Sequence, residues 1–201
     1  MPVSLIPSFL FYCSVTGVTP GPANLSSLSA AMHYGKKRAL VQWRGMLIGF
    51  TCVSVAAVFV TYYLGIVIGP YVRYLAWIGA AYIVWLAYHI LRSGDPAETS
   101  EQEAAKNCNF LTGLFIQLTN IKVMVLCLTA LSSYVLPYHT DFWILLVVGL
   151  ILPLIGGPMW NLIWLFAGAA LQDFFKKHYR PLNILMAAAL LACAVSLVWP
   201  R

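Results

Sequence analysis

Two polar segments interrupt apolar stretches of this sequence, and the first contains residues that would break a helix. It reads TPGPAN at residues 19 to 24. Pro20 and Pro22 lack an N–H group, and each disfavours helical geometry in the residue before it. A helix that reaches this segment must therefore stop and start again. Within a membrane, such irregular backbone is tolerated only where protein or a water-filled cavity covers it.

The interrupted backbone offers hydrogen-bond donors and acceptors together. The restarted helix is predicted to expose the N–H groups of Ala23, Asn24 and Leu25, which favour anions, and the stopped helix frees the carbonyl oxygens of Thr16 and Val18. Donors for a carboxylate and acceptors for an ammonium are what an amino acid requires. The predicted substrate-binding residues of this segment are Thr19, Pro20, Gly21, Pro22, Asn24 and Ser27. The alternative is a simple proline kink that neighbouring helices stabilise.

The second polar segment, QLTNIK at residues 117 to 122, places a lysine deep in an apolar stretch. Lys122 lies about eleven residues, or ~16 Å of helical rise, from the start of that stretch. Every acidic residue lies in or near a connection, so no protein carboxylate is available at this depth. Asn120 and Lys122 are therefore predicted to bind substrate, and Lys122 could also carry a coupled proton. The alternative is a lysine that is paired only with structural carbonyl oxygens.

A third stretch combines helix breakers with polar and aromatic side chains. It contains Pro153, Gly156 and Pro158, followed by Asn161 and Trp164. This pattern predicts a bent span that faces the same site. The residues predicted to line the cavity are Gln117, Asn161 and Trp164.

The composition predicts an all-α integral membrane protein. The 201 residues are 61% hydrophobic and 9% charged, whereas a soluble domain has about 25% charged residues. A helix needs ~20 apolar residues to cross a bilayer. About six runs are long enough, and they cover residues 4–32, 40–66, 70–91, 111–136, 142–170 and 182–199.

The positive charges indicate how these spans are oriented. The net charge is +6, and nine of the twelve Lys and Arg residues lie at the first, third and fifth connections. These nine are Lys36, Lys37, Arg38, Arg44, Arg92, Lys106, Lys176, Lys177 and Arg180. Because positive residues remain in the cytoplasm, both termini are predicted to lie outside. The charges are thus explained by topology and anionic lipid headgroups, without a nucleic-acid partner.

A hydrophilic linker at residues 93–109 divides this single transmembrane domain, residues 1–201, into two halves. Residues 1–92 and 110–201 each contain three predicted spans. An odd number of spans inserts the second half upside down, so the halves are predicted to be inverted repeats. The polar segments at 19–24 and 117–122 both fall in the leading span of a half. Matching interruptions of this kind indicate the binding site of a secondary transporter.

Other classes of function find less support in the sequence. The five cysteines are scattered, which predicts neither a disulfide framework nor a metal site. The sequence contains no HExxH, GxSxG or Walker motif, so we expect no enzyme and no cofactor. Two alternatives stay open. One is a membrane thiol relay that uses Cys13 and Cys127, and the other is a channel or structural subunit.

The segments TPGPAN and QLTNIK, with three-plus-three organisation, resemble the LysE/RhtB superfamily of bacterial amino-acid exporters. Residues 79–90 (GAAYIVWLAYHI), 129–138 (TALSSYVLPY) and 181–195 (PLNILMAAALLACAV) resemble the cysteine/O-acetylserine exporter branch. The resemblance implies an inner-membrane exporter of small neutral amino acids, foremost cysteine and O-acetylserine. It also implies alternating access driven by the proton motive force, with the amino acid and the bilayer as partners.

The sequence departs from the family pattern at two positions. The first segment ends in Ala23-Asn24 where TPGPNN is usual, and the second reads Asn120-Ile121-Lys122 where Asn-Pro-Lys is usual. Without the proline, we expect the second helix break to be softer than the first. The pairs Gly45/Gly49 and Gly65/Gly69 allow close helix packing, either inside one subunit or in a homo-oligomer.

Overall fold

The computed structural model describes residues 1–19, 21–68, 77, 80–81, 83–85, 87–88, 91–92 and 108–198. These residues form helices and short connections without a strand, which confirms the predicted all-α class for this part of the chain. Pro20, most of the predicted span 70–91 and nearly all of the linker 93–109 lie outside the described residues.

The first half begins with a short 3-10 helix, η1 (Val3–Leu5), and continues into α1 (Ile6–Val18). The next helix, α2 (Pro22–Ile68), meets α1 at an angle of 51°. It contains a non-helical residue, Gly35, whose φ of 78° is accessible to glycine because glycine has no Cβ. Gly35 therefore separates a short arm of α2 from the long helix that follows.

The second half begins with α5 (Phe110–Leu118) and α6 (Ile121–Thr129), and α6 continues as a π-helix, η3 (Ala130–Val135). After a short connection come α7 (Phe142–Ile155) and the long helix α8 (Gly157–Val198). Polar side chains mark two of these helix starts. Asn109 accepts a hydrogen bond from the backbone of Thr112, and Asp141 accepts from Trp143 and Ile144.

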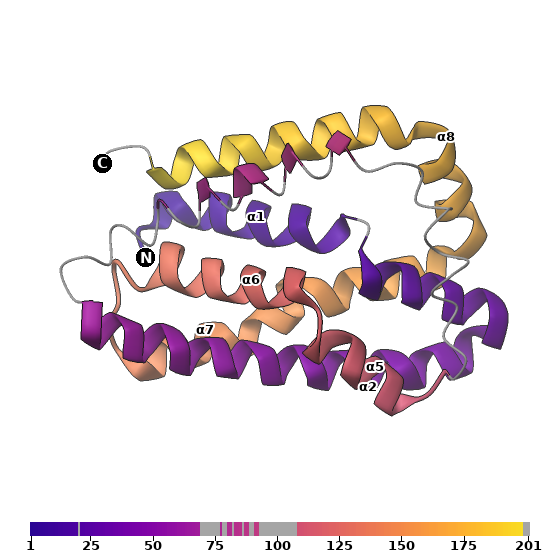
Figure 1. The fold of residues 1–201 in the computed structure, drawn as a ribbon, viewed down its shortest axis with the longest axis horizontal. Coiled ribbons are helices and arrows are strands. Elements are labelled where there is room, and N and C mark those ends of the chain that lie inside the picture. The colour runs from indigo at the N-terminus through magenta and orange to yellow at the C-terminus, as the bar shows by residue number, and fades with distance from the viewer. Residues whose placement is uncertain are drawn as a thin grey trace.

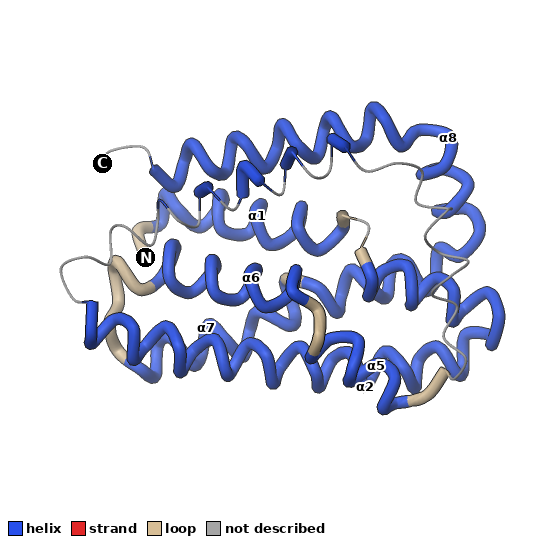
Figure 2. Tube along the Cα trace, in the orientation of Figure 1, coloured by secondary structure: helices blue, strands red, loops and turns tan. Residues whose placement is uncertain are grey.

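The second break is not softer than the first, so that prediction is wrong. α5 and α6 meet at 57°, compared with 51° at the first break, and Figure 2 shows the short non-helical segment between them. Asn120 explains the result, because its side chain accepts a hydrogen bond from the backbone N–H of Lys122 at 3.1 Å and caps α6. The side chain of Asn120 thus caps a new helix, although this chain lacks the proline of the Asn-Pro-Lys pattern.

The described residues contain two to four candidate membrane spans. Two helical stretches are long and apolar enough to cross a bilayer, Tyr34–Leu64 and Phe142–Ala167. Each of the two bent pairs, α1 with the arm of α2 and α5 with α6 and η3, can form one further span. The predicted sixth span is helical to Val198 as the end of α8. The total of six spans stays a prediction.

The two broken helices run antiparallel through the centre of the molecule (Figure 1). α6 lies between α1 and the long part of α2, and the C-terminal part of α8 covers α1 from the other side. The start of α1 and the end of α8 lie at one end of the molecule, and the turn at Gly35 lies at the opposite end. This arrangement brings both breaks to the middle.

Glycines allow α2 and α5 to approach closely. A Cβ on Gly45 would overlap the carbonyl oxygen of Phe110, and a Cβ on Gly113 would overlap that of Gln42. Gly49 likewise faces the backbone of α5. The Gly45/Gly49 spacing is therefore used for packing inside one subunit. Gly69 lies outside the described residues.

Candidate functional site

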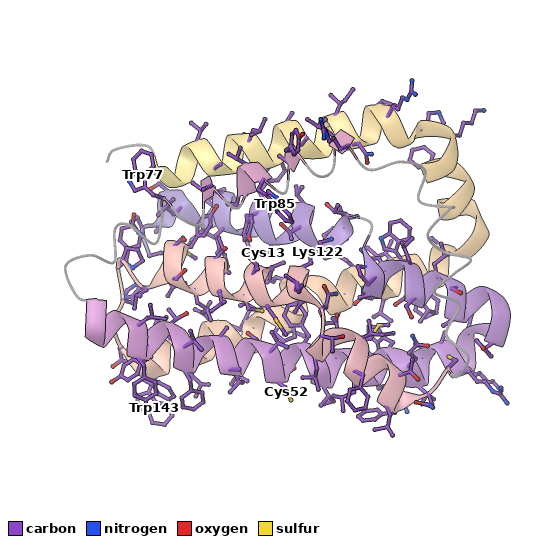
Figure 3. The ribbon with its side chains drawn as sticks, in the orientation of Figure 1. Cys13, Cys52, Trp77, Trp85, Lys122 and Trp143 are labelled. Carbon is purple, nitrogen blue, oxygen red and sulfur yellow. The ribbon has the colours of Figure 1, made fainter. Side chains whose placement is uncertain are left out.

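The two helix breaks meet through a lysine. Lys122 is the second residue of α6, and its Nζ donates a hydrogen bond to the carbonyl oxygen of Thr19 at 2.7 Å. Thr19 is the residue at which α1 ends, so its carbonyl oxygen is free of helical bonding. Figure 3 shows Lys122 in the interior between α1 and α6, whereas Cys52 and Trp143 lie at the margin. In this conformation the lysine is therefore paired with a carbonyl oxygen of the first predicted span.

Side chains also bind the carbonyl oxygens of Gly17, Val18 and Thr19 at the first break. The side-chain amide of Asn24 donates to Gly17 at 2.9 Å and to Thr19 at 2.8 Å. The indole N–H of Trp164 donates to Val18 at 3.2 Å. In an apolar surrounding each unsatisfied carbonyl would cost several kcal/mol, which explains why polar side chains converge here.

The restarted helix exposes fewer donors than predicted. The N–H of Leu25 donates to the carbonyl oxygen of Gly21 at 2.9 Å, so the prediction for Leu25 is wrong. Gly21 precedes the first residue of α2 and acts as the acceptor of the first helical bond. Pro22 has no N–H group, and the N–H groups left without a helical acceptor are those of Ala23 and Asn24.

At the second break, Asn120 connects two residues. Its Oδ1 accepts from the backbone N–H of Lys122, and its Nδ2 donates to Oε1 of Gln117 at 3.3 Å. Gln117 is fully buried and Asn120 is 6% exposed. The break is thus held by two amide side chains that also face the first break.

The third polar stretch also reaches the site, because the chain bends at Gly156 and α8 packs against α1. α7 ends at Ile155 and α8 begins at Gly157. From α8, Nδ2 of Asn161 donates to Oδ1 of Asn24 at 2.5 Å. Asn161 therefore connects the first break to the fifth predicted span.

These contacts enclose a small cavity at the two breaks. Its lining residues are Thr16, Gly17, Gly21, Ala23, Asn24, Phe50, Gln117, Asn120, Lys122, Val123, Leu126, Gly157 and Asn161. The free volume is about 20 Å³, which is close to the minimum that one water molecule needs. This space is too small for an amino acid, which therefore fits only if the breaks separate.

Most of the residues predicted for the site lie at this cavity. Gly21, Asn24, Gln117, Asn120, Lys122 and Asn161 line it. Thr19 contributes its carbonyl oxygen, while its hydroxyl donates to Val15 of its own helix. Pro22 begins α2 without lining the cavity, and Trp164 binds the adjacent carbonyl of Val18. The hydroxyl of Ser27 donates instead to the sulfur of Met46.

A family model for LysE-type translocators matches residues 14–200. The chain belongs to this family. It is similar to a cysteine/O-acetylserine efflux protein of Klebsiella pneumoniae, with 37% identity over 98% of this chain and 99% of the relative. Efflux proteins of the same description from Salmonella typhimurium and Escherichia coli are 34% and 33% identical, over 97% and 99% of this chain and 98% and 100% of those relatives. No solved structure matches the chain significantly. The resemblance predicted from the sequence is thus confirmed.

Sequence reasoning missed several lining residues of this LysE-type translocator. Thr16 is not one of them, because its carbonyl oxygen was predicted to be freed four residues before Pro20. Phe50, Val123 and Leu126 are apolar residues in apolar helices, and nothing in the sequence marks them as lining residues. Only the packing of α2 and α6 brings them to the cavity.

The two cysteines considered for a thiol relay do not lie at the cavity. Among the described residues, neither Cys13 nor Cys127 forms a disulfide, and both are fully buried. Neither lines the space between the breaks. The geometry at the site of this translocator therefore involves amides, carbonyl oxygens and one ammonium group.

Proposed function

We propose that this translocator exports small neutral amino acids, foremost cysteine and O-acetylserine, from the cytoplasm across the bacterial inner membrane. The observation that carries the proposal is the bond from Lys122 Nζ to the Thr19 carbonyl oxygen, at a cavity between two broken helices. The choice of substrates rests on the full-length relatives, which are described as cysteine/O-acetylserine efflux proteins.

The residues of the cavity suit the charges of an amino acid. The N–H groups of Ala23 and Asn24 and the ammonium of Lys122 would bind the carboxylate. The carbonyl oxygen of Thr19, which Lys122 leaves in order to reach the carboxylate, would accept from the substrate ammonium. Substrate thus replaces a protein contact between the breaks, which links binding to their separation.

The proposed architecture is six spans in two inverted repeats, with alternating access around the breaks and both termini outside. It is supported by the antiparallel course of the two broken helices and by the position of the two helix breaks near the centre (Figure 1). Lys36 Nζ lies 5.9 Å from the ring of Phe166, so the basic first connection lies near the end of the fifth predicted span. The positive-inside rule places this end in the cytoplasm.

The proposed driving force is the proton motive force. The sequence has no nucleotide-binding motif, so uphill export must use an ion gradient. Lys122 is the candidate proton carrier, because lysine can release its proton where arginine cannot. A homo-oligomer is compatible with this proposal, although the cavity is formed within one chain.

The first test is uptake of labelled cysteine and O-acetylserine by inside-out vesicles that contain the protein. We expect saturable uptake of both compounds that depends on an imposed proton gradient. Vesicles without the protein and a panel of other amino acids are the controls. Uptake of a different amino acid would contradict the substrate assignment, and uptake of none would contradict export altogether.

A further inference from the structure

Three polar side-chain atoms at the cavity have no hydrogen-bond partner among the residues that the structure describes. One is the hydroxyl oxygen of Thr16, which can donate or accept, and the other two are amide atoms, Nε2 of Gln117 and Oδ1 of Asn161. Both amide side chains line the cavity, with 0% and 2% of their surface exposed. A buried polar group without a partner is costly. Their position at the site indicates that a ligand binds them.

Backbone groups at the second break determine that Gln117 presents its donor. The N–H of Lys122 can only donate, so Asn120 must turn its Oδ1 toward it. Nδ2 of Asn120 then donates to Gln117, and Oε1 of Gln117 accepts because it is the only acceptor atom of that amide. The remaining Nε2 of Gln117 faces the cavity. A Cβ on Gly157 would lie 3.7 Å from this nitrogen and 2.9 Å from the ring of Phe50, so the glycine allows α8 to pack closely against both residues.

Backbone groups at the first break determine that Asn161 presents its acceptor. The carbonyl oxygens of Gly17 and Thr19 can only accept, so Asn24 turns its Nδ2 toward them. Oδ1 of Asn24 therefore accepts from Nδ2 of Asn161. The free Oδ1 of Asn161 is left for a ligand. Asn24 and Asn120 cannot flip without breaking a bond to the backbone, and Gln117 and Asn161 cannot flip without breaking their bond to these two side chains.

The donor nitrogen lies near Gly157 and the acceptor oxygen belongs to Asn161, and both of these residues are on α8. Gly157, which faces the donor nitrogen, and Asn161 are four residues apart on α8, and such positions lie ~6 Å apart on one helix face. A ligand that satisfies both groups must carry a donor and, a few bonds away, an acceptor oxygen. The α-ammonium and the acyl carbonyl oxygen of an O-acyl amino acid meet this requirement.

We propose that Asn161 Oδ1 binds the α-ammonium of the substrate and that Gln117 Nε2 binds the acyl carbonyl oxygen of O-acetylserine. Gln117 is then the residue that favours an O-acyl amino acid over cysteine, which has no oxygen at this position. This inference rests on the proposed function, because it assigns a role within the same export site.

The test compares two buried glutamines. Gln117→Met keeps the length of the side chain and removes the donor, and Gln42→Met changes a glutamine that donates to Ser26 away from the cavity. Uptake of labelled O-acetylserine and cysteine is measured in inside-out vesicles, with the amount of inserted protein quantified. We expect Gln117→Met to lower kcat/KM for O-acetylserine about tenfold relative to that for cysteine. Gln42→Met should leave the ratio of the two values unchanged.

An unchanged ratio in Gln117→Met would overturn the assignment of Gln117, although wild-type uptake would still support the proposed function. Wild-type vesicles that transport neither compound would instead contradict the proposed function itself. A second measurement on the wild-type protein needs no substitution. O-acetylserine should inhibit cysteine uptake at about tenfold lower concentration than O-ethylserine, in which a CH₂ group replaces the acyl carbonyl. Equal inhibition by the two compounds would overturn the inference.

Discussion

Lys122 is the residue on which the site depends most. Its side chain is partly buried, and its Nζ donates a hydrogen bond to the carbonyl oxygen of Thr19, the residue that follows α1. Every acidic residue of the sequence lies in or near a predicted connection, so we expect no carboxylate of the protein to pair with this ammonium. A charge at this depth is retained at a cost in stability. The carboxylate of a substrate is the partner that would offset this cost.

The variant Lys122→Ala tests this role. We expect it to reduce transport of cysteine about 100-fold, because a buried charged contact to the substrate is lost. Insertion into the membrane should be unchanged, since alanine suits a helix in lipid. Lys177→Ala is the control, because Lys177 is an exposed lysine on α8. Normal transport by Lys122→Ala would contradict the proposed role of the lysine.

At the scale of elements, the break between α5 and α6 shows that a capped helix start replaces a proline. Ile121 is the first residue of α6, and its side chain is 71% exposed. Asn120 before it has extended geometry, with φ of −79° and ψ of 99°. Proline suits the first position of a helix, because the N–H at that position has no helical acceptor. The residue before a proline also favours extended geometry.

We therefore expect Ile121→Pro to insert normally and to transport at a rate within about twofold of wild type. Met124→Pro is the matched control on the same helix. The N–H of Met124 donates to the carbonyl oxygen of Asn120 at 3.1 Å, and a proline there costs about 3 kcal/mol. Thermal unfolding in detergent and vesicle uptake measure both variants. Loss of transport in Ile121→Pro would mean that the break has a different geometry in the working protein.

At the scale of the whole molecule, two antiparallel broken helices bring their interruptions to one depth. The start of α1 and the end of α8 lie at one end, opposite the turn at Gly35 and the basic residues that follow it (Figure 1). The proposed inverted repeat would produce this arrangement, because its second half would repeat the course of the first in the opposite direction. Both halves then contribute to a site that neither forms alone.

Reporter fusions test this topology. A reporter joined after Lys106 should be active only as a cytoplasmic marker, and one joined after Arg201 only as an external marker. The reason is that an odd number of predicted spans, three, separates these two positions. Fusions that report the same side of the membrane would rule out two inverted halves of three spans.

The sequence by itself determined where helices stop and which polar groups lie deep in the membrane. The segment at residues 19–24 contains two prolines, and a proline breaks a helix wherever the chain later packs. Lys122 and Asn120 were likewise predicted because polar residues in long apolar stretches are rare and functional. The membrane class and the family resemblance required no tertiary information.

Only the tertiary structure decided which groups face each other. Ser27 was predicted for the site but binds Met46, whereas Phe50 and Val123 line the cavity without having been predicted. Composition and spacing fix the local geometry of a helix, but they do not fix its rotation against helices that are distant in sequence. That rotation depends on close packing, such as the contact of Gly113 with the backbone at Gln42. The free donor of Gln117 and the free acceptor of Asn161 arise from this packing. The other polar atom of each amide is hydrogen-bonded, that of Gln117 to Asn120 and that of Asn161 to Asn24.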